Sequence, residues 1–237
     1  MVNIEHPDLS HPGFGEFFIQ RHPDHLNLFP EMLTFAENNL RDPDQNRLFI
    51  YAHADDDPLT RLLEERDFVP LPEKIDDTSI LDVTKHEIPE SPVLPKGFHI
   101  QSMADDNNLE KRCKAFGTGF NHPDPLEWPS LIAYETLQNA PDYHKDQDIV
   151  VVSPNGEFAS FCLIWHDEPN QLAILEPVGT QPEFRRMGLA REAVYEAIRR
   201  VAVKGVEKVI VGSNQQFYKS IGFTPLEPRI CFQKSYI

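Results

Sequence analysis

From Gly97 to the C-terminus, apolar runs of strand length alternate with segments of helical periodicity. Residues 148–168 hold two apolar runs around Asn155 and Gly156, a pair that tolerates positive φ and therefore predicts a β-hairpin. Residues 171–180 form a third run, interrupted by Pro177. Because proline cannot donate to a sheet ladder, we expect a bulge or a splay there.

Helical spacing of apolar positions is clearest over residues 188–203, and Gly205 is the expected stop. The same patterns predict a strand at 97–103, a helix at 105–120, a strand at 207–213, a short helix at 214–223 and a final strand at 229–236. Strands that alternate with helices in this way favour an α/β fold with a mixed sheet.

The N-terminal part repeats this pattern. Residues 15–40 mirror residues 172–198, both being an apolar strand, a turn with proline and an amphipathic helix, and the alignment sets Pro23 against Pro182. Residues 77–100 contain one strand-like run and then three prolines, which indicates an extended connector. We therefore expect a domain boundary near residue 95, with a first unit over 1–95 and a second over 96–237.

Composition narrows the function classes. The chain of 237 residues has a net charge of -16, which opposes binding to nucleic acid or anionic membranes. Its three cysteines are widely spaced, its N-terminus lacks the basic and apolar regions of a secretory signal, and no apolar run is long enough to span a membrane. We expect a cytoplasmic protein. Among ten histidines, no two stand at i, i+4 spacing beside a glutamate, so no metal is expected.

Against this acidic background, residues 183–208 carry seven basic and four acidic side chains, a net +3. The first N–H groups of a helix that starts near Gly188 would bind phosphate oxygens, and Gly188 allows close backbone approach. Arg185, Arg186 and Arg191 could add charge-assisted bonds. The alternative is an ordinary helix start with solvated arginines.

Three motifs together resemble the GCN5-related N-acetyltransferase (GNAT) family. Arg185, Gly188 and Ala190 match its pyrophosphate motif Gln/Arg-x-x-Gly-x-Gly/Ala, residues 175–180 resemble its central strand, and Tyr218 begins a Tyr-x-x-x-Gly-Phe segment. The resemblance implies the GNAT fold with a splayed central strand, and acetyl-CoA as co-substrate. The residues it implies for coenzyme binding are Val178, Gly179, Thr180, Arg185, Arg186, Met187, Gly188, Leu189, Ala190, Arg191 and Asn214.

The two copies are similar to the tandem GNAT layout, of which mycothiol synthase is an example. In the first copy Leu26, Phe29 and Glu31 replace the three motif residues, and Leu63 and Asp67 replace Tyr218 and Gly222 of the second copy. Phe29 would block backbone approach and Glu31 would repel phosphate, so we expect one working site per chain. The first unit also begins late, which predicts a truncated unit, an exposed sheet edge and a possible homodimer.

By the same resemblance, a primary amine attacks the acetyl thioester directly and Tyr218 is the general acid. Glu176 is the candidate base, because strand alternation would place it on the face of Val178 and Thr180. His166 is an alternative base. Glu176 could also be an arginine's structural partner, and Tyr218 a core tyrosine.

The acceptor is less defined. Trp128 and Glu127, in the loop at 120–130, would suit a cationic amine, although such acidic loops are usually only solvated. We therefore expect an N-acetyltransferase that acts on a small-molecule amine. The alternatives are a non-catalytic acyl-CoA-binding or regulatory module and a protein N-acetyltransferase.

Overall fold

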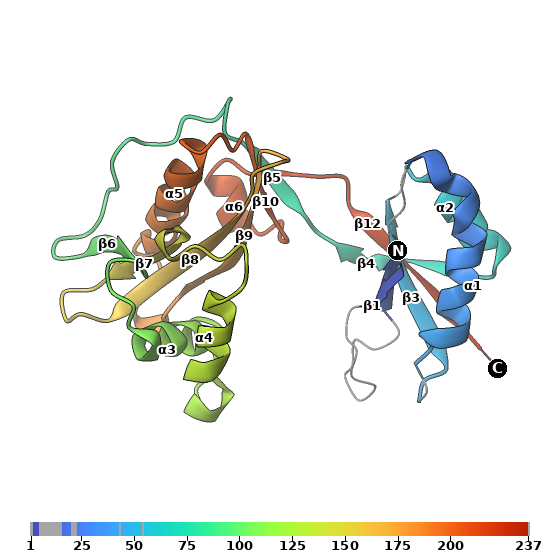
Figure 1. Ribbon diagram of the computed structural model, residues 1–237, viewed down its shortest axis with the longest axis horizontal. Helices are drawn as coiled ribbons and strands as arrows, with labels where there is room; N and C mark the ends of the chain where they lie inside the picture. Colours follow the sequence, from blue (N-terminus) through green and yellow to red (C-terminus); the bar gives the residue numbers. More distant parts are fainter. Residues whose placement is uncertain (1, 5–15, 20–22, 43, 54, 237) are drawn as a thin grey trace. The chain divides into compact units, whose positions relative to one another are not determined.

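The computed structural model describes residues 2–4, 16–19, 23–42, 44–53 and 55–236. The chain forms two compact units (Figure 1). One comprises Met1–Thr78 with Pro225–Ile237, and the other comprises Ser79–Thr224. Each unit is built on its own sheet.

The larger unit has a mixed seven-stranded sheet of order β11-β5-β10-β9-β8-β7-β6. The neighbours β9 and β10 pair in parallel, whereas the pairs β5–β10, β8–β9, β7–β8 and β6–β7 are antiparallel. The strand bounds are β5 (Ser79–Asp82), β6 (His99–Ser102), β7 (Asp148–Val152), β8 (Phe158–Asp167), β9 (Leu172–Thr180), β10 (Lys208–Val211) and β11 (Thr224–Pro225).

Helix α5 covers one face of this sheet, and α3 with α4 covers the other (Figure 1). The helix bounds are α3 (Leu109–Gly119), η2 (Pro125–Glu127), α4 (Leu131–Gln138), η3 (Lys145–Gln147), η4 (Pro182–Phe184), α5 (Leu189–Ala202) and α6 (Gln216–Ser220). The predicted helix at 188–203 and the hairpin at Asn155-Gly156 are confirmed, and Gly156 takes the positive φ of 80° that the turn requires. Burial of one apolar stripe of α5 explains why this segment is helical.

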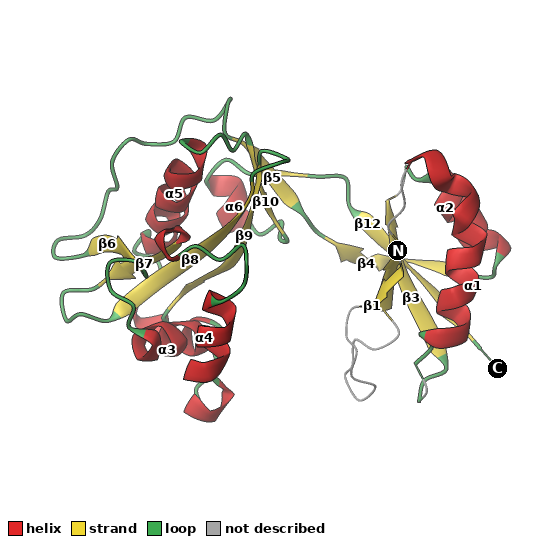
Figure 2. Cartoon of the chain, in the orientation of Figure 1, coloured by secondary structure: helices red, strands yellow, loops and turns green. Residues whose placement is uncertain are grey.

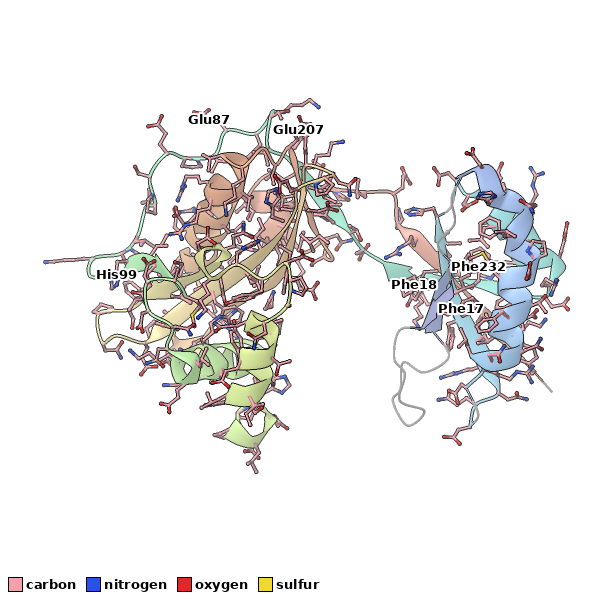
Figure 3. The ribbon with its side chains drawn as sticks, viewed as in Figure 1. Phe17, Phe18, Glu87, His99, Glu207 and Phe232 are labelled. Atoms are coloured by element: carbon pink, nitrogen blue, oxygen red, sulfur yellow. The ribbon has the colours of Figure 1, made fainter. Side chains whose placement is uncertain are left out.

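The smaller unit has a five-stranded sheet of order β1-β2-β3-β12-β4. Its elements are β1 (Val2–Ile4), β2 (Glu16–Ile19), η1 (Pro23–Leu28), α1 (Phe29–Asn39), β3 (Arg47–His53), α2 (Asp57–Glu65), β4 (Val69–Asp76) and β12 (Arg229–Ser235). Phe17 and Phe232, labelled in Figure 3, are buried in its core together with Leu33, Ile50 and Leu63.

The repeat seen in the sequence is present in the structure. The order β2, η1, α1, β3, α2, β4 in the first copy corresponds to β9, η4, α5, β10, α6, β11 in the second. The strand that follows each copy joins the sheet of the other copy: β5 pairs with β10, and β12 pairs with β3. The division of the structure therefore differs from the expected single boundary near residue 95, because strand pairing between distant segments leaves no trace in local periodicity.

The segment between β5 and β6 is mostly loop (Figure 2), in agreement with the expected connector. It is attached to α5 at two points. Buried Glu192 accepts a hydrogen bond from Val93 N (3.0 Å), and Arg199 Nη1 donates to Pro89 O (2.6 Å). The connector is thus ordered by side chains of α5.

Candidate active site

Strand β9 parts from its parallel neighbour β10 partway along its length. The ladder between them ends where Ile174 pairs with Ile210. Strand β10 ends at Val211, whereas β9 continues to Thr180. The two strands therefore separate as the sequence predicted for the central strand, and the C-terminal half of β9 lies beside the start of α5 and α6.

A β-bulge occurs at Pro177, as the sequence predicted. Between Leu175 and Val178, the two residues Glu176 and Pro177 of β9 lie opposite the single residue Leu163 of β8. One extra residue changes the phase of side-chain alternation by one position. The bulge therefore reverses which side chains of β9 face each side of the sheet.

This phase change corrects one expectation. Val178 packs against the same core, beneath α5, as Leu175, and Thr180 lines a pocket at the start of α5. Glu176 instead lines a pocket on the face covered by α3 and α4. The expectation that Glu176 shares a face with Val178 and Thr180 was wrong, because it assumed uninterrupted alternation.

The first pocket, of about 360 Å³, lies at the N-terminus of α5. It is formed by the end of β9, the η4–α5 turn and α6. Its lining residues are Thr180, Phe184, Arg185, Arg186, Gly188, Leu189, Ala190, Arg191, Phe217, Ser220 and Ile221. Most of the residues predicted to bind the coenzyme are therefore brought together here. Four predicted residues are not among those that line it: Val178, Gly179, Met187 and Asn214.

The backbone at the start of α5 suits an anion. Arg186 (φ 66°) and Gly188 (φ 80°) are both left-handed, which turns successive N–H groups toward one concavity. Gly188 is the N-cap and offers no side-chain acceptor to the first helical N–H groups. With the exposed Arg186 nearby, this turn fits a pyrophosphate, and Phe217 and Ile221 supply apolar walls.

The structure gives Arg185 a different task from the one expected of its side chain. Its Nε donates to Thr180 O (3.1 Å), and its Nη2 donates to Gly119 O (2.9 Å) and Asn121 Oδ1 (2.8 Å). The guanidinium thus joins the end of β9 to the end of α3. Arg191 is also engaged, in an ion pair with Glu192 (2.8 Å). Arg186 is the arginine of the three best placed to meet an added anion.

Tyr218 lies on α6 between Phe217 and Phe223, whose rings are at centroid distances of 5.0 and 5.7 Å. Only 9% of its surface is exposed. Burial raises the pKa of its hydroxyl to about 12, and the neighbouring Cys162 and Glu176 act in the same direction. The phenol therefore stays protonated at neutral pH, as a proton donor must.

The second pocket, of about 510 Å³, lies between α3, α4 and strands β8 and β9. Its residues are Phe116, Pro129, Ala133, Tyr134, Leu137, Leu163, Trp165, Glu176 and Pro177. Among the described residues of this lining, Glu176 supplies the only charged side chain. Trp165 Nε1 donates to Glu176 O (2.8 Å), so the indole fixes the backbone at the bulge.

A buried ionic network supports one wall of this second pocket. Asp148 accepts hydrogen bonds from Tyr134 (2.5 Å) and Tyr143 (2.8 Å), and it pairs with Arg112 Nε at 3.0 Å. Arg112 and Asp148 are both fully buried. The Arg112 guanidinium also lies 4.1 Å from the Phe161 ring centroid. This network fixes the orientation of Tyr134.

Other predicted acceptor residues lie outside both pockets. Trp128 packs on Gly117, where an added Cβ would come within 1.9 Å of the indole, and its Nε1 donates to His122 O. Glu127 interacts with His122 at 3.2 Å. His166 pairs with Ala173, in the part of β9 that is still joined to β10. Glu176 therefore lines a cavity large enough for an acceptor, whereas Trp128, Glu127 and His166 do not.

Gly179 has a packing role that the sequence did not reveal. An added Cβ would lie 2.4 Å from the Phe161 ring, so only glycine allows this approach. Its carbonyl accepts a hydrogen bond from Ser160 Oγ (2.8 Å). The ring of Phe161 thus determines how closely β9 approaches β8 next to the site.

Sequence reasoning missed the contribution of α6 to the first pocket and all of the aromatic lining of the second. Phe217 and Ser220 of α6 and the C-cap residue Ile221 stand at i, i+3 and i+4, a spacing that could have identified one face of this helix. Phe116, Tyr134 and Trp165 come from three separate elements, so their meeting depends on the tertiary fold. No local signal indicates the second pocket.

Within the described ranges, no group of three or more His, Cys, Asp or Glu side chains is arranged to hold a metal ion. None of the helices in the described part of the chain has the length and apolar character that crossing a membrane requires.

Residues 110–223 match the model of the acetyltransferase (GNAT) family. This match spans most of the larger unit, which carries the splayed strand and the uncapped helix start described above. The larger unit is therefore a member of the GNAT family. No curated protein matches the chain in sequence.

Solved structures share the fold of both units. A GCN5-related N-acetyltransferase from Sphaerobacter thermophilus has a TM-score of 0.67 at 16% identity, covering 92% of this chain and 72% of that one. A tandem GNAT protein from the clavulanic acid biosynthesis pathway has a TM-score of 0.66 at 12% identity, covering 94% and 75%. The chain is thus similar to tandem GNAT proteins, with a small N-terminal α/β unit before the C-terminal GNAT unit.

Proposed function

We propose that the larger unit transfers the acetyl group of acetyl-CoA directly to a primary amine of a small molecule. One observation carries this proposal: two pockets flank β9 on opposite faces of the sheet where it leaves β10, one suited to an anion and the other containing a carboxylate. Family membership of this unit supports acetyl-CoA as the donor.

The first pocket would hold the coenzyme. The N–H groups at the start of α5 and the Arg186 guanidinium would bind the pyrophosphate, and the backbone of Val178 and Thr180, free of β10, would bind the pantetheine arm. Acetyl-CoA supplies an activated acetyl thioester. In the first copy, buried Phe29 opens α1 and its N-cap Leu28 is right-handed, so we expect one coenzyme per chain.

Two residues of this chain would move protons. Glu176 lines the second pocket and would accept the proton of the attacking amine, directly or through water. Tyr218 would donate its proton to the departing sulfur, a role that its raised pKa supports. The positioning of amine and thioester on the two sides of β9 would provide the rest of the rate enhancement.

The test measures thiol release from acetyl-CoA with a panel of amines, together with calorimetric binding of coenzyme A. Glu176→Gln and Tyr218→Phe should each lower kcat by about 10² to 10⁴ while coenzyme binding, with a stoichiometry near one, is kept. Exposed Glu168→Gln is the matched control and should retain wild-type kcat.

Binding of coenzyme A without turnover of any amine would reject catalysis and support an acyl-CoA-binding regulatory module instead. Turnover confined to peptide arrays would identify a protein N-acetyltransferase. Turnover unchanged in both Glu176→Gln and Tyr218→Phe would contradict the assigned proton transfers.

A further inference from the structure

The polar atoms around the second pocket are mostly engaged within the protein. The Tyr134 hydroxyl donates to Asp148, so what Tyr134 offers to the pocket is its ring. Trp165 Nε1 donates to Glu176 O, which leaves the indole ring as lining. Phe116, Leu137 and Leu163 complete apolar walls. The protein surface that a ligand would touch in this pocket is therefore mostly hydrocarbon.

Glu176 is the exception, because its carboxylate is the one charged group that the described part of the chain contributes to this lining. It lies at the bulge, next to Pro177, where β9 and β10 have already separated. A carboxylate at the edge of an apolar, aromatic cavity attracts one cationic group, so it favours a ligand that carries an ammonium over a ligand that carries an anion. The charge pattern thus orients a ligand with its amine at the bulge and its body between α4 and β8.

We propose that the acceptor is a monoamine with an apolar body, an alkylamine or arylalkylamine. This inference rests on the proposed function and specifies its substrate class. A cavity of about 510 Å³ accommodates such a molecule. Amino sugars would place hydroxyl groups against the Leu137 and Leu163 side chains without partners, and polyamines would bury a second ammonium there. The carboxylate of an amino acid would be repelled by Glu176.

A series of unbranched primary amines from ethylamine to hexylamine tests this, because its members differ in apolar length and hardly in basicity. We expect kcat/KM to rise about fourfold per added methylene until the pocket is filled. We also expect phenethylamine to exceed glucosamine, lysine and spermidine by at least about tenfold. A flat series, or preference for one of the polar amines, would overturn the inference while leaving the acetyltransferase activity established.

A matched pair of variants on α4 locates the effect. Ala133 lines the pocket, whereas its neighbour Ile132 is 74% exposed and lies outside the lining. Ala133→Trp should lower kcat/KM for hexylamine at least about tenfold and for ethylamine less than about twofold, because the indole occupies the distal space. Ile132→Trp should leave both amines and the KM of acetyl-CoA within about twofold. Equal effects of the two variants, or no effect of Ala133→Trp on hexylamine, would contradict the assignment.

Calorimetric binding of the same amines separates this inference from the proposed function. If no amine is acetylated but affinity rises with chain length in wild type and falls in Ala133→Trp, the apolar amine site stands and catalysis fails. If affinity is independent of chain length, the substrate class is wrong whether or not turnover occurs.

Discussion

Removal of one charge from the buried Arg112–Asp148 pair tests how the wall of the second pocket is held. In Asp148→Asn, the amide can still bond to Tyr134 and Tyr143, whose hydroxyls can rotate to accept or donate. The Arg112 guanidinium, however, loses its only nearby carboxylate at full burial, and its Nη1 and Nη2 already have no hydrogen-bond partner in the described structure.

The expected cost follows from that uncompensated charge. Breaking a buried ion pair on one side typically costs about 3–5 kcal/mol, which is a large share of the roughly 5–15 kcal/mol of a typical domain. Arg112→Met combined with Asp148→Asn removes the charge and keeps a polar partner for both tyrosines. The double variant should therefore recover at least about 2 kcal/mol relative to Asp148→Asn alone.

Urea unfolding followed by circular dichroism measures both values, with the single variant Arg112→Met completing the double-mutant cycle. A loss below about 1 kcal/mol in Asp148→Asn would refute the reasoning, since it would mean that water or relaxation solvates Arg112. A double variant no more stable than Asp148→Asn would refute it as well, because the cost would then come from the hydrogen bonds.

Three further outcomes follow from the site. Arg186→Ala should weaken coenzyme A binding about threefold to tenfold at unchanged Tm. Arg185→Ala should instead lower Tm, because it removes the hydrogen bonds between β9 and α3. Calorimetry of coenzyme A binding and thermal melts distinguish the two variants. Gly179→Ala should cost about 1–3 kcal/mol in urea unfolding, with partial recovery on adding Phe161→Leu, which makes room for the Cβ. Burial raises the pKa of the Tyr134 hydroxyl far above its unfolded value. The contribution of this hydroxyl to the free energy of unfolding is therefore complete below pH of about 10 and is lost as pH rises toward the folded pKa. Tyr134→Phe should reduce the difference in stability between pH 9 and pH 11 by about 1.4 kcal/mol.

The elements that depend on local pattern were predictable from the sequence. Helix α5 has its apolar residues at regular helical spacing, and Asn155-Gly156 determines a hairpin by its own backbone preferences. The start of α5 could also be predicted, because Gly188 stands at the N-cap within one short motif and has no Cβ to block close approach to the backbone.

The features that depend on contacts between distant segments could not be predicted from the local sequence pattern. Strands β5 and β12 each look like ordinary strands of the nearest unit, yet each pairs with the sheet of the other copy. Arg185 looks like an anion ligand in its motif, and only the fold brings Gly119 and Asn121 within reach of its guanidinium. The second pocket likewise exists only where α3, α4 and β8 meet.

The bulge at Glu176-Pro177 shows how one local irregularity can determine chemistry. With regular alternation after Leu175, Val178 and Thr180 would both have faced the α3–α4 side of the sheet. The extra residue places Val178 and Thr180 on the α5 side, next to the first pocket, whereas Glu176, which directly follows Leu175, faces the apolar cavity on the other side. In the proposed reaction, β9 would therefore present backbone to the thioester on one face and a carboxylate to the amine on the other, which is the separation that direct transfer between two bound substrates requires.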